Sequence, residues 1–550
     1  MRMKAFAASA LFAAASLTAV WPCGSAASSG SAAVAVDGTT IPAHNAADAP
    51  AAELAIYKPR EFAAMDFNDP ASRWSFARSR ESEHFIVFWE PGFGADPNSE
   101  AVPEELRVDV DDLLAKVERF YQTNTERLGF RGEGKSRLDR YKLEIYLLYQ
   151  KDWLATGAGY DDVIGALWVN PSTCKPVGAT IAHEIGHSFQ YQVCCDRLLN
   201  GAAPEPATGF RYAHHSPRLR SASDAPISGG LPRADAVASS AAAGVVSVVV
   251  DGYEQDGLGN ALWEQCAQWQ ASQDYPEDAF AWYHRETWAK NCHRAFENEW
   301  FRYQSYWFLT NVKELHGQDA VGKVWNNAVQ PDDFIDCYLR LFLDGDVGRL
   351  NDELYRYASH AATFDFDGFR EILPDEWRDC YAPCFYPVND NPDAPDAFQI
   401  GYASCPDETG FNVLPIPADR YVPGEPVAIR FTALPVGAPT APGDPGEVRR
   451  GGNSDDVEFV TKNYNSPRPD VVPDHRYGFV ALLKDGSRVY GPMNRGGVNV
   501  VEFKAPADAE RLYFVVAGAA TKHYRHVWNE KESDDIQLPY LIEFVTDKTR

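Results

Sequence analysis

The segment ATIAHEIGHSFQYQVCCD, residues 179–196, contains the motif HEIGH at residues 183–187. On a helix, His183 and His187 lie one turn apart on the same face, about 40° from each other. Two imidazoles in this arrangement can bind one zinc ion, and Glu184 beside them can accept a proton from zinc-bound water. Because such a site needs a third ligand, the motif alone leaves open a chance pairing of two histidines on one helix.

The motif segment also has the pattern of a closely packed helix. Ile181, Ile185 and Phe189 form an apolar stripe, whereas Ala182 and Gly186 are small. A glycine inside a helix costs about 1 kcal/mol relative to alanine. Gly186 therefore indicates that another element approaches this helix closely.

The residues around the motif predict an α+β region, with a small mixed sheet before the motif helix and a mainly helical half after it. Apolar residues at helical spacing predict helices at residues 108–130, 259–272 and 293–317. Runs rich in β-branched and aromatic residues predict strands at HFIVFWE (84–90), YKLEIYLLY (141–149) and GALWVNP (165–171).

The C-terminal part has a different pattern. A segment rich in Pro, Asp and Asn, CFYPVNDNPDAPD at residues 384–396, precedes short alternating runs such as PVAIRFTAL, YGFVALLKDG, VNVVEFKA, RLYFVVAGA and YLIEFVT. Such runs, separated by turn residues, are typical of an all-β sandwich. The predicted divisions are a signal peptide (1–27), a disordered leader (28–75), a catalytic domain (76–385) with a low-complexity insertion (201–250), a linker (386–396) and a β-sandwich (397–550).

The chain start and the charge indicate where the protein works. Arg2 and Lys4 precede an apolar run from 5 to 20 and then small residues, which predicts export to a periplasm or out of the cell. The net charge of −27 speaks against nucleic acid or an anionic membrane as partner.

Nine cysteines would remain after signal cleavage, so we expect several disulfides, including one that anchors Cys194 or Cys195 at the end of the motif helix.

Three glutamates between the motif and residue 270 are candidates for the third zinc ligand. Glu205 lies between prolines, and Glu254 lies in a segment rich in Gly and Asp. Glu264 lies in the predicted helix NALWEQCAQWQA, where a carboxylate among apolar residues needs a partner. The alternative is a solvent-facing glutamate on a half-buried helix. The sequence therefore favours Glu264.

The motif, followed by a helix containing WEQCAQW, resembles the gluzincin branch of the zincin metallopeptidases, in which two His and one Glu on successive helices bind zinc. The chain also resembles a largely uncharacterised family of secreted proteins with a C-terminal β domain. The resemblance implies that His183, His187 and Glu264 bind Zn²⁺, and that Glu184 is the general base. It also implies an edge strand over the cleft, for which GALWVNP is the candidate. The long spacing from His187 to Glu264 departs from the compact gluzincin pattern.

Gluzincins usually add a Tyr or His that stabilises the oxyanion. Tyr303 and Tyr306 in RYQSYW are the candidates for this role, with aromatic core packing as the alternative. Clusters of Asp and Asn at 389–396 and 534–535 carry the oxygen ligands that Ca²⁺ prefers, but solvation in a linker and a turn is the default interpretation of both. His214 and His215 lie in a loop rich in Ser, Pro and Arg, where we expect them to be solvated.

These observations predict a secreted zinc-dependent hydrolase, a metallopeptidase that cleaves proteins or glycoproteins. The alternative is a non-catalytic protein with a zincin-like scaffold that binds glycans or glycoproteins through its C-terminal domain. The presence of Glu184 favours catalysis, because a binding protein has no need of a general base.

Overall fold

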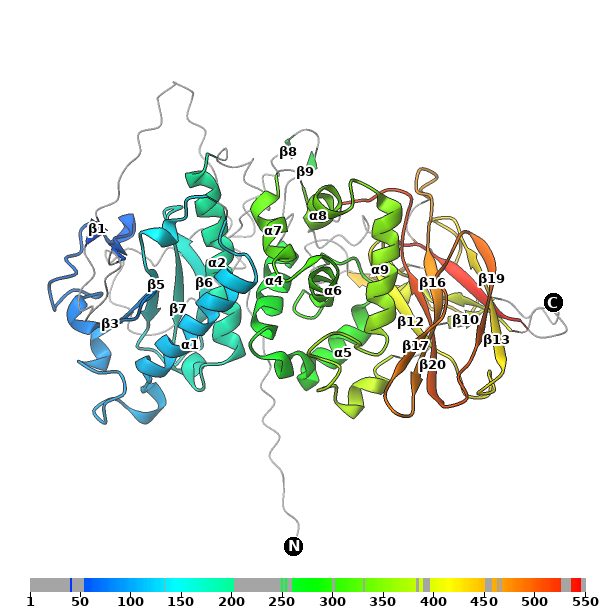
Figure 1. Cartoon of the computed structure of the whole chain (residues 1–550), viewed down its shortest axis with the longest axis horizontal. Helices are drawn as coiled ribbons and strands as arrows, with labels where there is room; N and C mark the ends of the chain where they lie inside the picture. The colour runs from blue at the N-terminus through cyan, green and yellow to red at the C-terminus, as the bar shows by residue number, and fades with distance from the viewer. Residues whose placement is uncertain are drawn as a thin grey trace, which may run out of the picture.

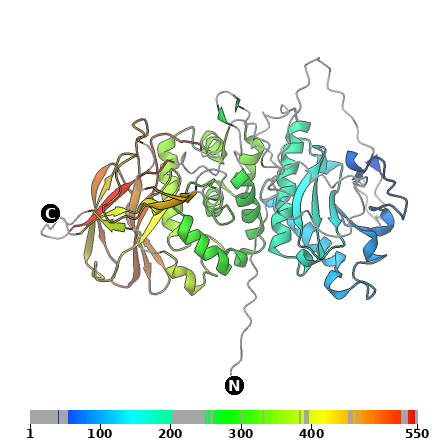
Figure 2. The same ribbon diagram turned by 180° about the vertical axis from the view of Figure 1, so that it is seen from behind.

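The computed structural model describes residues 40–41, 54–132, 134–201, 249–250, 253–254, 260–298, 302–329, 332–381, 385–388, 396–450, 458–461, 464, 467–525 and 536–545. A mixed sheet region, a helical half and a β domain follow one another along the long axis of the molecule (Figure 1, Figure 2). No helix within the described residues combines the length and the apolar character needed to cross a membrane.

The first sheet has the strand order β3-β4-β5-β7-β6. Its three central strands are parallel, and β3 and β6 pair antiparallel at the two edges. The helices α1 (Val110–Gln122) and α2 (Ala179–Leu199) lie against one face (Figure 1). The strands are β3 (Ser79–Glu81), β4 (Phe85–Trp89), β5 (Leu143–Leu147), β6 (Ala155–Tyr160) and β7 (Ile164–Val169).

The edge strand nearest the motif helix differs from the expectation. The segment GALWVNP forms β7, which lies between β5 and β6, whereas the edge strand is β6 with the sequence ATGAGY. A Cβ atom on Gly157 would lie 1.6 Å from the carbonyl oxygen of Glu184, and one on Gly159 would lie 2.1 Å from the ring of Tyr191. The glycines are needed because α2 lies so close to β6. Since glycine is uncommon in strands, residue propensities do not predict a strand here.

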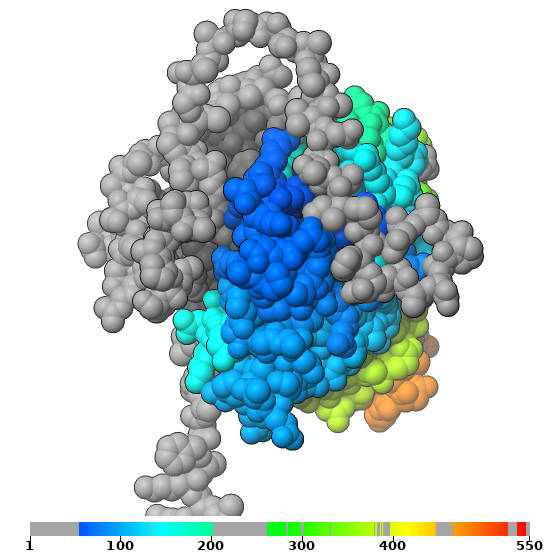
Figure 3. All heavy atoms as spheres, turned by 90° about the vertical axis from the view of Figure 1, so that its left-hand side faces the viewer, coloured from blue at the N-terminus to red at the C-terminus, as the bar shows by residue number. Residues whose placement is uncertain are grey.

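Part of the predicted leader belongs to the folded region. The segment that begins at residue 54 covers the face of the sheet opposite α2. It contains β2 (Ile56–Tyr57), which pairs with β1 (Thr40–Ile41). Phe62 and Trp74 pack on Tyr146 of β5 with ring centroids 5.7 and 4.9 Å apart. Much of the surface at this end of the molecule is formed by these residues (Figure 3). The leader boundary predicted at residue 75 was therefore too late, since a few aromatic residues anchor a segment of otherwise polar composition.

A carboxyl group is buried within this sheet. Glu144 of β5 is fully buried, and the hydroxyl of Tyr146 donates a hydrogen bond to its Oε2 at 2.6 Å. Its Oε1 has no hydrogen-bond partner among the described residues. Burial raises the pKa of Glu144 from 4.5 to about 8, so the folded protein holds a proton there at neutral pH.

Replacing Glu144 by Gln should remove part of the pH dependence of stability. Between pH 4.5 and about 8 the folded state retains a proton that the unfolded state has lost. The free energy of unfolding should therefore fall as pH rises, by about 1.4 kcal/mol per pH unit from this group. Urea unfolding at pH 5, 6.5 and 8 gives the change of the unfolding free energy with pH. This change should be smaller for Glu144→Gln than for the wild type, and it should equal the wild-type value for the exposed control Glu100→Gln. Equal slopes in all three proteins would contradict the prediction.

The helical half is built from six helices within the described residues. The predicted helix at 293–317 begins only at Trp307, because residues 292–296 pair with the β domain instead: the Asp407 amide donates to the His293 carbonyl at 2.8 Å, and the Phe411 amide to the Cys292 carbonyl at 2.9 Å. The helices are α4 (Asn260–Ser272), α5 (Trp282–Asn291), α6 (Trp307–His316), α7 (Ala320–Asn327), α8 (Phe334–Phe342) and α9 (Val347–Ala361).

The C-terminal domain is a sandwich of two antiparallel sheets, with the strand orders β10-β11-β21-β13-β19 and β12-β20-β16-β17, and β18 pairs with β16. The fold-class prediction, an α+β region followed by an all-β sandwich, is confirmed. The strands are β10 (Phe385–Pro387), β11 (Ala397–Ile400), β12 (Phe411–Pro415), β13 (Pro426–Ala433), β16 (Arg476–Leu483), β17 (Arg488–Tyr490), β18 (Asn494–Arg495), β19 (Val498–Lys504), β20 (Ala509–Ala517) and β21 (Tyr540–Phe544). Two short hairpins lie outside these sheets, β8 (Val249–Val250) with β9 (Tyr253–Glu254) and β14 (Glu447–Arg450) with β15 (Glu458–Thr461).

The β domain shares a core with the helical half. Successive residues of β12, β16 and β20 point to opposite faces of their sheet. Phe479 and Phe514 pack between the two sheets, whereas Val480, Tyr513 and Val515 belong to the core that contains the helices. In Figure 1, α9 lies along this second face. The sheet is thus buried on both sides, and the domain is part of one folded unit.

Of the two cysteines expected to form a disulfide at the end of the motif helix, Cys195 does not form one. Cys195 is a buried thiol. Burial raises the pKa of this thiol well above its usual range, which makes it unreactive. Cys195 therefore acts as a small apolar residue in the packing of α2.

Candidate metal centre

The motif helix α2 packs directly on α4, and the contact is made by small residues. A Cβ atom on Gly186 would lie 3.3 Å from the Cα atom of Ala267. This confirms that another element approaches the motif helix at Gly186. The close approach allows side chains of α4 to reach those of α2 across the interface.

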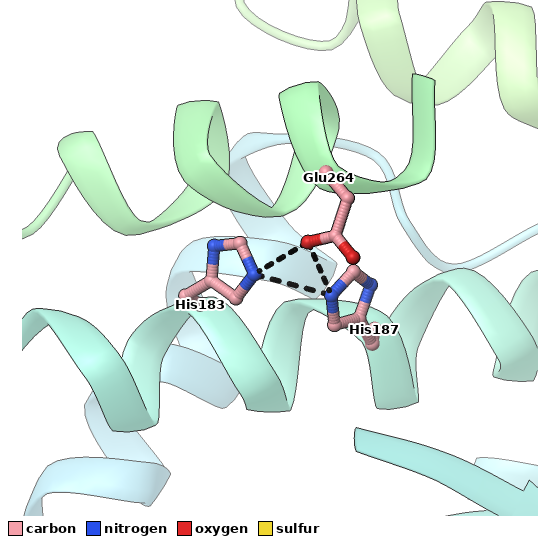
Figure 4. A group of neighbouring side chains, drawn as sticks. All are labelled: His183, His187 and Glu264. Carbon is pink, nitrogen blue, oxygen red and sulfur yellow. Dashed lines mark hydrogen bonds and ion pairs between the residues drawn. The ribbon is translucent and has the colours of Figure 1, made fainter. Parts of the chain in front are cut away.

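Three side chains from these two helices converge on one point (Figure 4). The Nε2 atoms of His183 and His187 lie 3.2 Å apart. Glu264 Oε2 lies 3.1 Å from His183 Nε2 and 3.4 Å from His187 Nε2. Both histidines are buried, at 8% and 6% exposure. The group predicted from the sequence is thus brought together as a set that can hold a metal ion.

The other nitrogen of each imidazole faces an amide oxygen. Gln190 Nε2 donates to the carbonyl of Trp263 at 3.1 Å, which leaves its Oε1 facing His187 Nδ1 at 3.0 Å. Gln268 Nε2 donates to Asp278 Oδ2 at 3.4 Å, which leaves Gln268 Oε1 facing His183 Nδ1 at 3.0 Å. Because an amide oxygen can only accept, both Nδ1 atoms carry a proton, and Nε2 is in each ring the nitrogen that can bind a metal ion.

This donor set fits a divalent cation. Burial raises the pKa of Glu264, but the two histidines outweigh burial and hold this pKa well below its usual range, so the carboxyl group is ionised. Two imidazole Nε2 atoms and one carboxylate oxygen therefore face the same point. Ligands of a tetrahedral zinc ion lie roughly 3.3 Å apart, which matches the three separations between 3.1 and 3.4 Å.

Glu184 lies beside the three ligand candidates and outside their set. Its Oε2 accepts a hydrogen bond from the Gly157 amide of β6 at 3.0 Å. Burial raises the pKa of Glu184 to about 7, with a further contribution from Glu264. A carboxyl group in this range exchanges a proton readily near neutral pH, as a general base must.

The two tyrosine candidates lie in different surroundings. The half-buried ring of Tyr303 lies 6.0 Å from that of His183, between centroids. Burial raises the pKa of Tyr303, with Glu264 contributing, so the hydroxyl keeps its proton. Tyr306 stacks on Trp307 at 5.1 Å and is 1% exposed. The structure thus places Tyr303 next to the histidines and Tyr306 in the aromatic core.

The sequence interpretation did not single out the amides that orient the histidines. Gln190 follows His187 by one helical turn, and Gln268 follows Glu264 by one turn. Their positions on the ligand face of each helix were the available signal. Local spacing cannot show that they hydrogen-bond, because each amide orientation is fixed by a partner elsewhere in the chain.

A second group, at the junction with the β domain, has a different character. His523 Nε2 lies 2.7 Å from Asp333 Oδ2, and its Nδ1 lies 3.1 Å from Glu408 Oε2. Arg525 binds the neighbouring Asp336. Burial lowers the pKa of His523, but Asp333 and Glu408 outweigh it and hold the pKa well above its usual range. Both ring nitrogens donate to carboxylates, so this group, although it could hold a metal by composition, is satisfied as an interdomain ion pair.

Several predicted features lie outside the described residues. These are His214 and His215, Glu205, nearly all of the insertion at 201–250, and the calcium candidates at 389–396 and 534–535 except Asp396.

Comparison with known proteins gives a family. No curated protein matches the chain. Solved structures that match include the C-terminal family 22 carbohydrate-binding module of Clostridium thermocellum Xyn10B, with 11% identity, 29% of this chain and 76% of the module covered and a TM-score of 0.15. A protein from Sulfurospirillum deleyianum matches with 10% identity, 28% of this chain and 99% of that chain covered and a TM-score of 0.14. At such low scores nothing about binding follows for this chain. A family model matches residues 48–218 and 243–549, so the chain belongs to DUF6055, a family of unknown function.

Proposed function

We propose that this protein is an exported zinc-dependent hydrolase, a metallopeptidase of the gluzincin type that cleaves proteins or glycoproteins. The observation that carries the proposal is the convergence of His183 Nε2, His187 Nε2 and Glu264 Oε2, with separations of 3.1 to 3.4 Å. Two imidazoles and one carboxylate, held with their protons turned away, form the donor set of hydrolytic zinc sites. Zinc is the proposed metal because this nitrogen-rich, three-ligand set matches its preference.

The chain's own residues supply the remaining functions. A zinc ion held by the three ligands supplies Lewis acidity, which acidifies water and polarises a carbonyl group. Glu184 accepts the proton from the attacking water and later donates it to the leaving amine. The Gly157 amide, 3.0 Å from Glu184 Oε2, holds this carboxylate in place. Tyr303, which keeps its hydroxyl proton, supports the developing oxyanion from the His183 side.

The proposed partners follow from this activity. The substrate is a protein or glycoprotein met outside the cytoplasm, as the predicted signal peptide indicates, and a glycan contact through the C-terminal domain is part of the proposal. The non-catalytic alternative predicts zinc binding without any hydrolysis.

The decisive experiment measures metal content and hydrolysis on the same full-length preparation. We expect one zinc ion per chain by mass spectrometry, release of labelled peptides from casein or mucin, and loss of both after treatment with a chelator. Restored zinc should restore activity. His183→Ala should bind no zinc, whereas the control His316→Ala, which removes a histidine paired with Glu353 elsewhere, should bind normally. Absence of zinc from the wild-type protein, even after zinc is added, would refute the proposal.

A further inference from the structure

The amide that orients His187 is the first link of a longer chain of hydrogen bonds. Gln190 Nε2 donates to Gln270 Oε1 at 2.9 Å, and Gln270 Nε2 donates to Asn124 Oδ1. Asn124 Nδ2 then donates to the backbone carbonyl of Phe120 at 2.9 Å. The three amide side chains are at most 2% exposed. The chain therefore runs through the interior from α2 across α4 to the end of α1.

The chain has one direction only. The carbonyl of Phe120 can only accept, so the nitrogen of Asn124 faces it and the oxygen of Asn124 faces Gln270. Gln270 must then present its nitrogen to Asn124 and its oxygen to Gln190. Gln190 in turn presents its oxygen to His187, whose Nδ1 must donate. A flip of any one amide would place two donors or two acceptors against each other in a dry interior, which costs free energy at both ends.

The distant end of the chain lies in an irregular turn. Asn124 belongs to the π-helical turn Thr123–Arg127 that follows α1. Such turns are rare and occur frequently at functional sites. Neither Asn124 nor Gln270 contacts the three ligand candidates through any described interaction, so burial of two amides here has no explanation in the metal site taken alone.

We propose that Asn124, Gln270 and Gln190 are positioning residues that hold His187 in the tautomer with its proton on Nδ1, so that Nε2 is free to bind the metal. The inference rests on the proposed function, because this tautomer matters only if Nε2 is a ligand. The chain also resists rotation of the imidazole, since the ring cannot turn without breaking its bond to Gln190. The metal site is thus oriented from three helices, although its ligands come from only two.

The first test compares two substitutions of equally buried amides. Gln270→Met removes the middle link without adding charge or much volume. Its control, Gln192→Met, removes an amide on α2 whose hydrogen bonds go to the Gly165 amide and to Asp196. In chelator competition we expect the zinc affinity of Gln270→Met to fall about tenfold, the lower end of the range for outer ligand partners. Gln192→Met should retain the wild-type affinity. Equal affinity in both variants would overturn the proposal.

The second test reads the tautomer directly and needs no metal. Nitrogen-15 NMR of the metal-free full-length protein should show His187 protonated on Nδ1 in the wild type and in Gln192→Met. In folded Gln270→Met, the form protonated on Nε2 should appear, because Gln190 has lost one of its two anchors. An unchanged tautomer would contradict the inference even if zinc binds. A wild-type protein that shows this tautomer dependence but binds no zinc would refute the proposed function and leave the hydrogen-bonded chain supported.

Discussion

Glu184→Gln should lose hydrolytic activity by roughly 10²- to 10⁴-fold, the usual contribution of a general base, and should still bind one zinc ion. The amide oxygen of glutamine can accept the Gly157 hydrogen bond that the carboxylate now accepts at 3.0 Å. The shape of the site is therefore kept, and only the ability to accept a proton is lost. The measurements are peptide release from casein or mucin and zinc content by mass spectrometry on the same sample.

The matched comparison for this variant is Glu264→Gln. Both substitutions replace a partly buried carboxylate by an amide of equal size, but Glu264 faces both histidine nitrogens, and its charge is part of the donor set. Glu264→Gln should therefore lose both zinc affinity and activity. Full activity in Glu184→Gln would remove this residue from the mechanism. Activity absent from the wild type, with zinc bound, would favour the non-catalytic alternative.

His523→Ala should cost about 3 to 5 kcal/mol of unfolding free energy, since it leaves two buried carboxylates without their cation. Asp333 and Glu408 bind its two ring nitrogens at 2.7 and 3.1 Å. Asp333 is the N-cap residue of α8 in the helical half, whereas Glu408 and His523 belong to the β domain. The substitution therefore acts on the junction between them. Urea unfolding monitored by tryptophan fluorescence gives the free energy.

A rescue variant distinguishes charge from packing at this junction. Adding Asp333→Asn and Glu408→Gln to His523→Ala removes the uncompensated charges and should recover a large part of the lost stability. In all of these proteins the two halves should unfold in one transition, because Val480, Tyr513 and Val515 of the β domain lie in the same core as the helices. Two separate transitions in the wild type would contradict a shared core.

Local periodicity and residue chemistry are enough to predict several elements of this fold. The motif helix, the strands β4, β5 and β7, and five strands of the sandwich follow from patterns that repeat every 3.6 or 2 residues. Gly186 predicted a close contact with another element, because glycine destabilises a helix and is expected there only where something approaches closely. Strand β6 was not predicted, because glycine has a low propensity for strands. Its glycines are required by the close approach of α2, which is a tertiary contact.

The identity of the two histidines, their spacing and the carboxylate beside them were determined by the sequence alone, because four residues along a helix always return to the same face. Only the tertiary structure decided that Glu264 completes the set, because this required α4 to pack at Gly186 against Ala267. Only the tertiary structure decided, too, which nitrogen of each ring faces the other members of this candidate metal site. That choice depends on Gln190 and Gln268, whose own orientations are fixed by hydrogen bonds across the core, and no local pattern encodes contacts between residues so far apart in the chain.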